Sequence, residues 1–295
     1  MKILVTGAGG QLGTDVAAEL KNRKIDFTGV DVIAAGSNEI LDITDAEAVR
    51  RYINIHKPLC VIHCAAYTAV DKAEDEPELC FIVNATGTEN IAKTCRETGT
   101  EMIYISTDYV FGGNENEPYE TDAVKNPGST YGKSKLAGEE AVLKHLDKYY
   151  IVRISWVFGS AGGNFVKTIK RLATEKDKIN VVCDQVGSPT YTVDLAGLLC
   201  DMALSGKYGI YHATNEGYCS WAEFATEIVK QSGVSCIINP IQSESYPTKA
   251  KRPKNSRLSK ACLERAGFKR LPAWQDALGR FIEQEKHVER ERNDI

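Results

Sequence analysis

The segment STYGKSKLAGEE, residues 129–140, places a tyrosine and a lysine four residues apart. Four residues make about one helical turn, so Tyr131 and Lys135 would leave the same face of a helix. A phenol normally ionises near pH ~10, and a neighbouring ammonium stabilises the phenolate and lowers that pKa. The pair therefore has the composition of a general acid–base, although the same spacing also occurs on ordinary helix surfaces.

A hydroxyl group from another part of the chain completes this set. The apolar run EMIYIST, residues 101–107, predicts a buried strand that ends at Thr107. Carboxyl ends of parallel strands meet at one sheet edge, where ligands bind, so we expect Thr107 beside Tyr131 and Lys135. In a carbonyl reduction Tyr131 would give a proton to the oxygen and Thr107 would hold that oxygen.

Short apolar runs alternate with longer amphipathic segments through the first half of the chain. The pattern predicts strands at 2–7, 26–31, 59–66, 101–107 and 149–155, and helices at 11–23, 45–56, 77–99 and 130–146. Asp45 is a suitable N-cap for the second helix. Such alternation predicts an α/β fold with a Rossmann-type, doubly wound parallel sheet.

Beyond residue 156 the alternation becomes less regular. Helices are predicted at 164–176 and 220–233, and a strand at 209–214. We therefore expect an NAD-binding Rossmann domain over 1–155, with a return of the chain around 185–215. The remainder, 156–295, would form mainly a smaller C-terminal α/β lobe that binds the substrate.

A glycine-rich loop follows the first predicted strand directly. GAGGQLG has glycines at 7, 10 and 13, between that strand and the first helix. Glycines permit a tight turn, close approach of the backbone to a pyrophosphate, and close packing of helix on strand. The helix N-terminus adds free N–H groups and positive potential. The position of Gly7, Gly10 and Gly13 favours a dinucleotide site over a plain turn.

An acidic residue ends the second predicted strand. The carboxylate of Asp31 can accept hydrogen bonds from the ribose hydroxyls of adenosine, and it would repel a 2′-phosphate. No arginine follows it directly to reverse that preference. The sequence therefore predicts NADH as the preferred cofactor, with NADPH as the alternative.

Composition excludes several classes of protein. The chain has 295 residues, a net charge of −4 and a pI near 5.8, which argues against bulk nucleic-acid binding. No apolar run is long enough for a membrane span or a signal peptide. The nine cysteines form no CxxC pair, and Cys60, His63 and Cys64 have no further ligand nearby for zinc. Free thiols without a secretory signal indicate a reducing cytoplasm.

Seven segments between residues 3 and 258 carry a resemblance to a known family. They are ILVTGAGGQLG, AAYTAVDKAEDEPE, STDYVFGG, YGKSKLAGE, RISWVFG, DQVGSPTY and KRPKNSRL. Together they resemble the extended short-chain dehydrogenases/reductases, and within them the RmlD-like dTDP-4-dehydrorhamnose reductase family. The resemblance implies NADH-dependent reduction of the 4-keto group of a nucleotide sugar, dTDP-4-dehydro-L-rhamnose, to dTDP-L-rhamnose.

The resemblance also assigns residues by position. The catalytic set is Thr107, Tyr131 and Lys135. Cofactor contacts fall on the glycine loop, on later strand ends and on the catalytic pair: Gly7, Gly10, Gln11, Leu12, Gly13, Asp31, Asp42, Ile43, Ala65, Ala66, Tyr67, Thr68, Tyr131 and Lys135. Histidine is a common occupant of position 67 in the family. Substrate contacts fall on Thr107, Asp108, Trp156, Arg252 and Arg257.

Two of these assignments have a structural alternative. Trp156 follows a buried strand directly, so it could equally be a core indole. The segment KRPKNSRL carries Arg252, Lys254 and Arg257, which could hold a diphosphate or simply be solvated charges. The residues alone do not say which of the three would touch phosphate.

Some members of the family hold magnesium between subunits with glutamates. The corresponding positions here are Asp15 and a site near Val193 and Asp194. Because these positions do not carry glutamate, we predict no metal ligand. The oligomeric state, including the homodimer that the resemblance implies, is left open for the same reason.

Three alternative functions differ in their net chemistry. The first is reduction of another nucleotide-linked 4-keto sugar, and the second is epimerisation or dehydration of such a sugar. Dehydratases usually have an Asp-Glu pair after the catalytic threonine, whereas Thr107 is followed by Asp108 and Tyr109, which favours reduction. The third is a non-catalytic NAD-binding regulatory subunit, which the presence of Tyr131 and Lys135 disfavours.

Overall fold

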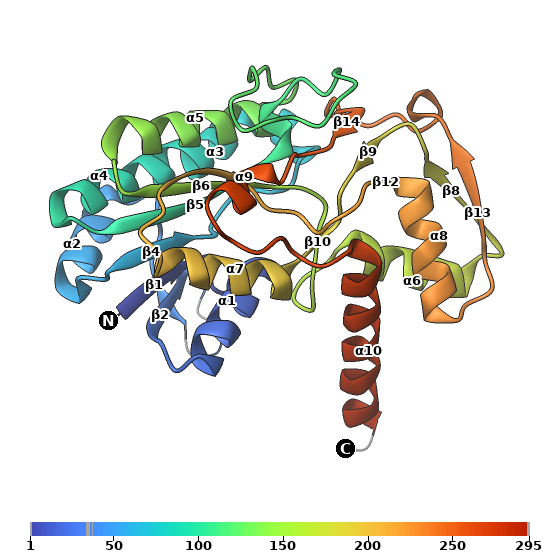
Figure 1. Ribbon diagram of the computed structural model, residues 1–295, viewed down its shortest axis with the longest axis horizontal. Helices are drawn as coiled ribbons and strands as arrows, with labels where there is room; N and C mark the ends of the chain where they lie inside the picture. Colours follow the sequence, from blue (N-terminus) through green and yellow to red (C-terminus); the bar gives the residue numbers. More distant parts are fainter. Residues whose placement is uncertain (1, 34–35, 37, 294–295) are drawn as a thin grey trace.

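The fold is built around one parallel sheet. A computed structural model describes residues 2–33, 36 and 38–293, and Figure 1 shows the sheet between two layers of helices. The strands are hydrogen-bonded in the order β11-β6-β5-β4-β1-β2-β3, and all neighbours are parallel. They are β1 (Lys2–Thr6), β2 (Asp26–Asp31), β3 (Glu39–Ile40), β4 (Cys60–His63), β5 (Glu101–Thr107), β6 (Tyr149–Ile154) and β11 (Gly209–His212).

Helices cover both faces of this sheet, which explains why its central strands are apolar without alternation. In β1, Ile3 and Val5 pack into the cluster on one face and Leu4 into the cluster on the other. The first cluster is closed by α1 (Gln11–Asn22) and α7 (Thr192–Ala203), and the second by α2 (Ala46–His56), α4 (Thr88–Thr98) and α5 (Thr130–His145). The predicted Rossmann-type, doubly wound sheet is confirmed.

The strand order reverses next to β1. The chain runs from β1 outward through β2 and β3, and then fills the other side with β4, β5, β6 and β11. In open α/β sheets the ligand binds at the carboxyl edge near such a reversal. The glycine loop and the end of β4 lie on either side of this point.

Two predicted elements differ from the structure by more than one or two residues at an end or by a division of the element. The strand expected over 59–66 ends at His63, and the backbone leaves the sheet there. The helix expected over 77–99 is divided into α3 (Pro77–Phe81), a π-helical turn (Ile82–Gly87) and α4. A π-turn inserts extra backbone and is frequent at functional sites. Here it carries the buried Asn84, whose contacts are described below.

The remaining elements form a smaller lobe with its own apolar core. Its longer elements are α6 (Phe165–Glu175), β8 (Lys178–Val182), α8 (Trp221–Ser232), β13 (Ile237–Ile241) and α10 (Trp274–Asn293). Two-residue strands make the rest: β7 (Val157–Phe158) with β10 (Thr190–Tyr191), and β12 (Cys219–Ser220) and β14 (Asn255–Ser256) on either side of β9 (Val186–Gly187). The short α9 (Ala261–Arg265) packs beside β11, and α10 extends away from the body (Figure 1).

Three short 3-10 turns connect these parts: η1 (Lys72–Glu74), η3 (Asp108–Val110) and η4 (Ser243–Ser245). Within the described ranges, none of the helices has the length and apolar character needed to cross a membrane. All nine cysteines are free thiols.

Candidate functional site

Most of the predicted site residues lie at the carboxyl edge of the sheet. β1 ends at Thr6, β2 at Asp31, β4 at His63 and β5 at Thr107. Thr6 pairs in register with His63, and the strands run parallel, so the loops that follow them share this edge. Each predicted residue is considered below from the cofactor side to the substrate side.

The glycine loop leaves no room for a side chain at Gly7 or at Gly13. Gly7 has φ +66°, and a Cβ there would lie 2.6 Å from Ala65 N. A Cβ at Gly13 would collide with Gly7 O. Gly10 donates its N–H to Gly7 O at 3.0 Å and is the N-cap of α1, where no side chain caps the helix. The tight turn and uncapped helix N-terminus fit the pyrophosphate of a dinucleotide.

Asp31 lies against this loop. Its carboxylate accepts hydrogen bonds from Gly9 N at 2.9 Å and from Val32 N at 2.8 Å. The backbone thus fixes the carboxylate at the end of β2, next to the loop that would hold the pyrophosphate. This is where an acid can receive ribose hydroxyls.

Asp42 and Ile43, predicted beside the adenine, have different environments. Asp42 is exposed, and its Oδ1 accepts hydrogen bonds from the backbone and hydroxyl of Thr44. Ile43 is buried, and a Cβ added at Gly87 would lie 2.8 Å from its Cδ1. Gly87 therefore lets the π-turn approach Ile43 closely.

The loop containing Ala65, Ala66, Tyr67 and Thr68 is fixed by Asn84. Asn84 Oδ1 accepts Tyr67 N at 2.8 Å, and its Nδ2 donates to Tyr67 O at 3.0 Å. The Tyr67 hydroxyl donates to Glu76 at 2.8 Å; partial burial and this contact raise the pKa of Tyr67 to about 12. Asn84 Nδ2 also donates to Ser134 Oγ on α5 at 2.9 Å, which joins the predicted nicotinamide side to the helix of Tyr131.

Tyr131 and Thr107 are brought together. Ser129 caps α5 by accepting Gly132 N at 3.1 Å, so Tyr131 lies in the first turn. Its phenol lies near the hydroxyl of Thr107, which offsets part of the rise in the pKa of Tyr131. Tyr109 packs edge-on against the Tyr131 ring, with centroids 5.5 Å apart.

The protein does not lower the pKa of Tyr131, contrary to the expectation from its spacing with Lys135. Burial raises this pKa above its ordinary value, the hydrogen bond with Thr107 opposes the rise, and the charge of Asp108 adds to it. The phenol is therefore kept protonated, which is the form that can donate a proton to a carbonyl oxygen.

Lys135 lies one turn further along α5 and is only 3% exposed. Its Nζ is 4.1 Å from the centroid of the Tyr104 ring, a cation–π contact. Burial lowers the pKa of Lys135 to about 7, with the negative charge of Glu139 opposing the change. Its ammonium therefore titrates near neutral pH, and added negative charge close by would favour the cation.

Asp108 is buried directly after Thr107, and its Oδ1 accepts the Thr107 hydroxyl at 3.1 Å. Burial raises the pKa of Asp108 to about 6, while hydrogen bonds with Ser256 and Thr107 oppose the change. Its Oδ2 has no hydrogen-bond partner among the described residues. A buried polar atom without a partner at a ligand edge is suited to a substrate hydroxyl.

Trp156 has an uncommon backbone conformation for a bulky residue, with φ +50°. Its ring stacks on Trp221 with centroids 3.6 Å apart and planes 13° apart. A Cβ at Gly187 would lie 2.8 Å from the indole. Such conformations cluster at functional sites, where the surrounding structure maintains them.

The three cations of KRPKNSRL have three different sets of partners. Arg252 pairs with Asp71 at 2.7 Å, whereas Lys254 lies 3.1 Å from both Asp184 and Glu244. Arg257 donates to Asn255 Oδ1 at 2.8 Å and to Asn116 O. Of these three, only Arg252 lines the small cavity that also includes Tyr109 and Ser129. A larger cavity of about 510 Å³ lies between α6 and α10, and its lining contains none of the predicted site residues.

Sequence reasoning missed two supports of α5 and the buried hydrogen bonds of His63. Arg153 is fully buried and bidentate to Glu139 on α5, with both N–O distances at 2.8 Å, and Ser106 also donates to Glu139. Asn84, which donates to Ser134, is the second support of α5. His63 lies between Thr6 Oγ1 at 2.6 Å and Thr88 Oγ1 at 3.1 Å, which leaves no zinc role for it. A polar residue within an apolar stretch was the only sequence signal for each of them.

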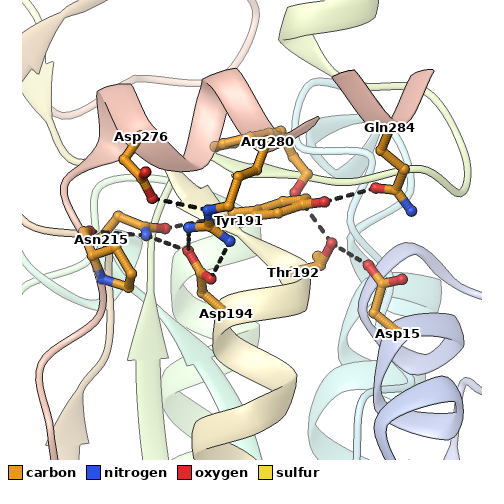
Figure 2. A network of polar contacts seen from close by, with 10 residues as sticks. Asp15, Tyr191, Thr192, Asp194, Asn215, Asp276, Arg280 and Gln284 are labelled. Carbon is orange, nitrogen blue, oxygen red and sulfur yellow. Dashed lines mark hydrogen bonds and ion pairs between the residues drawn. The ribbon is translucent and has the colours of Figure 1, made fainter. Parts of the chain in front are cut away.

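The positions considered for magnesium are occupied by protein contacts. Figure 2 shows Thr192 Oγ1 donating to Asp15 at 2.5 Å, and Arg280 forming a bidentate pair with Asp194 at 2.7 and 2.8 Å. Asn215 also donates to Asp194. Within the part of the chain that the structure describes, no group of three or more His, Cys, Asp or Glu could hold a metal ion. These residues do not fit a magnesium site.

The chain was compared with known proteins. It matches the family model described as the RmlD substrate binding domain over residues 1–287. The spore coat polysaccharide biosynthesis protein SpsK of Bacillus subtilis is 40% identical, with 96% of this chain and 97% of that protein covered. A dTDP-4-dehydrorhamnose reductase of Streptomyces griseus is 42% identical, with 93% and 91% covered.

A solved structure shows the same fold. The dTDP-4-dehydrorhamnose reductase of Bacillus anthracis, crystallised in complex with NADP, superposes with a TM-score of 0.91 at 40% identity. The match covers 96% of this chain and 99% of that one.

Proposed function

The chain belongs to the RmlD family of dTDP-4-dehydrorhamnose reductases, and on this premise we propose that it reduces the 4-keto group of dTDP-4-dehydro-L-rhamnose to give dTDP-L-rhamnose. It is an oxidoreductase that uses a nicotinamide cofactor. One observation carries the assignment of the catalytic set. The Tyr131 phenol meets the Thr107 hydroxyl at the carboxyl edge of the sheet, and the buried Lys135 lies one turn behind.

The bound cofactor would supply hydride to the carbonyl carbon. Tyr131, which burial keeps protonated, would donate its proton to the carbonyl oxygen. The Thr107 hydroxyl, which donates to Asp108 Oδ1 at 3.1 Å in this structure, would turn its single O–H toward that oxygen and hold it by a hydrogen bond. Lys135 would stabilise the phenolate left on Tyr131, because an ammonium close to a phenolate favours the charged form.

The substrate would lie on the side of Asp108 and Trp156. The unpartnered Oδ2 of Asp108 would accept a sugar hydroxyl, and the Trp156 indole would form a wall of the sugar pocket. Of Arg252, Lys254 and Arg257, we assign Arg252 to the diphosphate, because it is the one of the three that lines the small cavity beside Ser129 and Tyr109, which Lys251 also lines.

We propose NADH as the preferred cofactor. The fixed carboxylate of Asp31 can accept both ribose hydroxyls and would repel a 2′-phosphate. The relative from Bacillus anthracis was crystallised with NADP, so NADPH is the necessary comparison in any test of this preference.

The decisive experiment measures oxidation of NADH and of NADPH with a panel of nucleotide 4-keto sugars, with dTDP-4-dehydro-L-rhamnose as the expected best substrate. The dTDP-L-rhamnose product is identified by NMR. An epimerase or a dehydratase would convert sugar without net oxidation of cofactor, and a regulatory subunit would show no turnover. Faster reduction of another sugar in the panel would replace the substrate assignment but keep the reductase.

A further inference from the structure

A short segment of the substrate lobe is fastened to the nucleotide-binding domain. We call residues 249–254 the strap; it lies between η4 and β14. The Arg252 Nη2 donates to Asp71 Oδ2 at 2.7 Å, and Ala250 N donates to Asp71 Oδ1 at 3.0 Å. Lys249 Nζ also pairs with Asp75. Both carboxylate oxygens of Asp71 are therefore used on the strap.

Asp71 stays charged while it holds the strap. Partial burial alone would raise its pKa, but the hydrogen bond from Ala250 N and the charge of Arg252 outweigh burial and keep the pKa below its ordinary value. Its side chain is 45% exposed and that of Arg252 is 32% exposed. This pair lies at the surface of the site, so replacing one partner should not unfold the protein.

Arg252 keeps unused hydrogen-bonding capacity. A guanidinium has five N–H donors, and Asp71 takes one of them from Nη2. The Arg252 Nε is buried and has no partner among the described residues. The cavity that Arg252 lines also includes Ser129, the cap of α5, and Tyr109, which packs against the ring of Tyr131.

The segment that holds the strap also holds the start of the catalytic helix. Glu74 accepts Thr130 N and Thr130 Oγ1, both at 2.8 Å, directly before Tyr131. Two residues further, Glu76 accepts the hydroxyl of Tyr67 from the cofactor loop. Asp71, Glu74 and Glu76 thus connect the strap with α5 and with the cofactor loop.

We propose that Asp71 is a positioning residue, which holds the Arg252 guanidinium in place for the diphosphate of the nucleotide sugar. An arginine that is already ordered loses less conformational entropy on binding, and its planar donors match phosphate oxygens. This proposal rests on the proposed function, because it assigns the diphosphate to the substrate.

The test compares Asp71→Asn with a matched control, Asp75→Asn, which removes the neighbouring contact to Lys249 in the same segment. For Asp71→Asn we expect the KM for dTDP-4-dehydro-L-rhamnose and the Kd for dTDP to rise roughly tenfold, since one charged hydrogen bond is lost. The kcat and the KM for NADH should stay within about twofold, and Asp75→Asn should match the wild type.

The same change made in a second variant, Arg252→Gln, distinguishes a positioning role of Asp71 from a merely structural role. In Arg252→Gln, the further change Asp71→Asn should leave the Kd for dTDP unaltered, because Asp71 acts through Arg252. An unchanged KM in Asp71→Asn, or an equal loss of dTDP affinity in both backgrounds, would overturn the proposal. A rise in the KM for NADH alone would assign the phosphate to the cofactor and would overturn it too.

The two proposals fail in different ways. A wild-type protein that binds dTDP through Asp71 and Arg252 but does not reduce the sugar would contradict the proposed reaction and support the positioning role. A wild-type protein that reduces the sugar, with dTDP affinity independent of Asp71, would support the proposed reaction and contradict the positioning role.

Discussion

The two halves of the site are held by different kinds of contact. On the proposed cofactor half, backbone atoms at the ends of β1, β2 and β4 define much of the geometry, and Gly7 and Gly13 have no space for a side chain. On the substrate half, two-residue strands and the strap are joined by side-chain contacts such as Arg252 with Asp71. A backbone geometry without space for a Cβ admits few substitutions, whereas a side-chain pair can change one residue at a time and leave the backbone as it is. We therefore expect the cofactor half to tolerate fewer substitutions and the substrate half to determine specificity.

The Tyr131→Phe variant tests the residue that lies between the cofactor half and the substrate half. Removal of the phenolic proton should lower kcat by about 10² to 10⁴-fold, the usual contribution of a general acid. The Kd for NADH should stay close to that of the wild type, because the glycine loop and Asp31 are unaffected. Steady-state kinetics and a titration with NADH measure the two quantities. Near-normal turnover would remove Tyr131 from the proposed chemistry.

Gly13→Ala tests the backbone-built half. The added methyl would collide with Gly7 O, and overpacking of this kind typically costs about 1–3 kcal/mol. We expect NADH affinity to fall by roughly 10 to 100-fold. The matched change on the substrate side is Gly128→Ala, whose methyl would lie 3.4 Å from the flexible end of Lys251. It should leave NADH affinity unchanged, and equal losses in both variants would contradict the distinction between the halves.

Asp31→Ala removes the one side chain on which we rest the cofactor preference. The ratio of kcat/KM for NADH to that for NADPH should fall roughly tenfold, because the ribose hydroxyls lose a charged acceptor and a 2′-phosphate is no longer repelled. Kinetics with both cofactors give this ratio directly. A ratio equal to the wild-type value would contradict the role assigned to this carboxylate.

Acid stability can be tested at two buried histidines of the sheet. Burial lowers the pKa of His63 in β4 and of His212 in β11 to about 3, with the charges of Lys135 and Arg153 adding to the respective shifts. The folded state therefore binds fewer protons than the unfolded state between about pH 3 and 6.5, so stability falls as the pH falls through this window. Each histidine should contribute a slope of up to about 1.4 kcal/mol per pH unit.

Denaturant unfolding at several pH values measures this slope. The variants His63→Gln and His212→Gln should each reduce this slope by the equivalent of about one proton, however much the variant lowers the free energy of unfolding at neutral pH. A slope equal to that of the wild type would mean that the replaced imidazole is already protonated in the fold.

The sheet and the proposed catalytic set could be predicted from local patterns. Continuous apolar runs and helical periodicity predicted a parallel sheet, and the strand end at Thr107 predicted its place near Tyr131. Three features depended on contacts between distant segments and had no local signature. The π-turn around Asn84 follows from its bonds to Tyr67 and Ser134, the strap from Asp71, and the raised pKa of Tyr131 from burial.

The stacked tryptophans give the protein an internal optical probe. Trp156 lies two residues after the end of β6, whereas Trp221 begins α8 of the smaller lobe, and their rings are in contact. A movement of α8 relative to the end of β6 would slide or separate these two indoles. Tryptophan emission would therefore follow such a movement in solution without an added label.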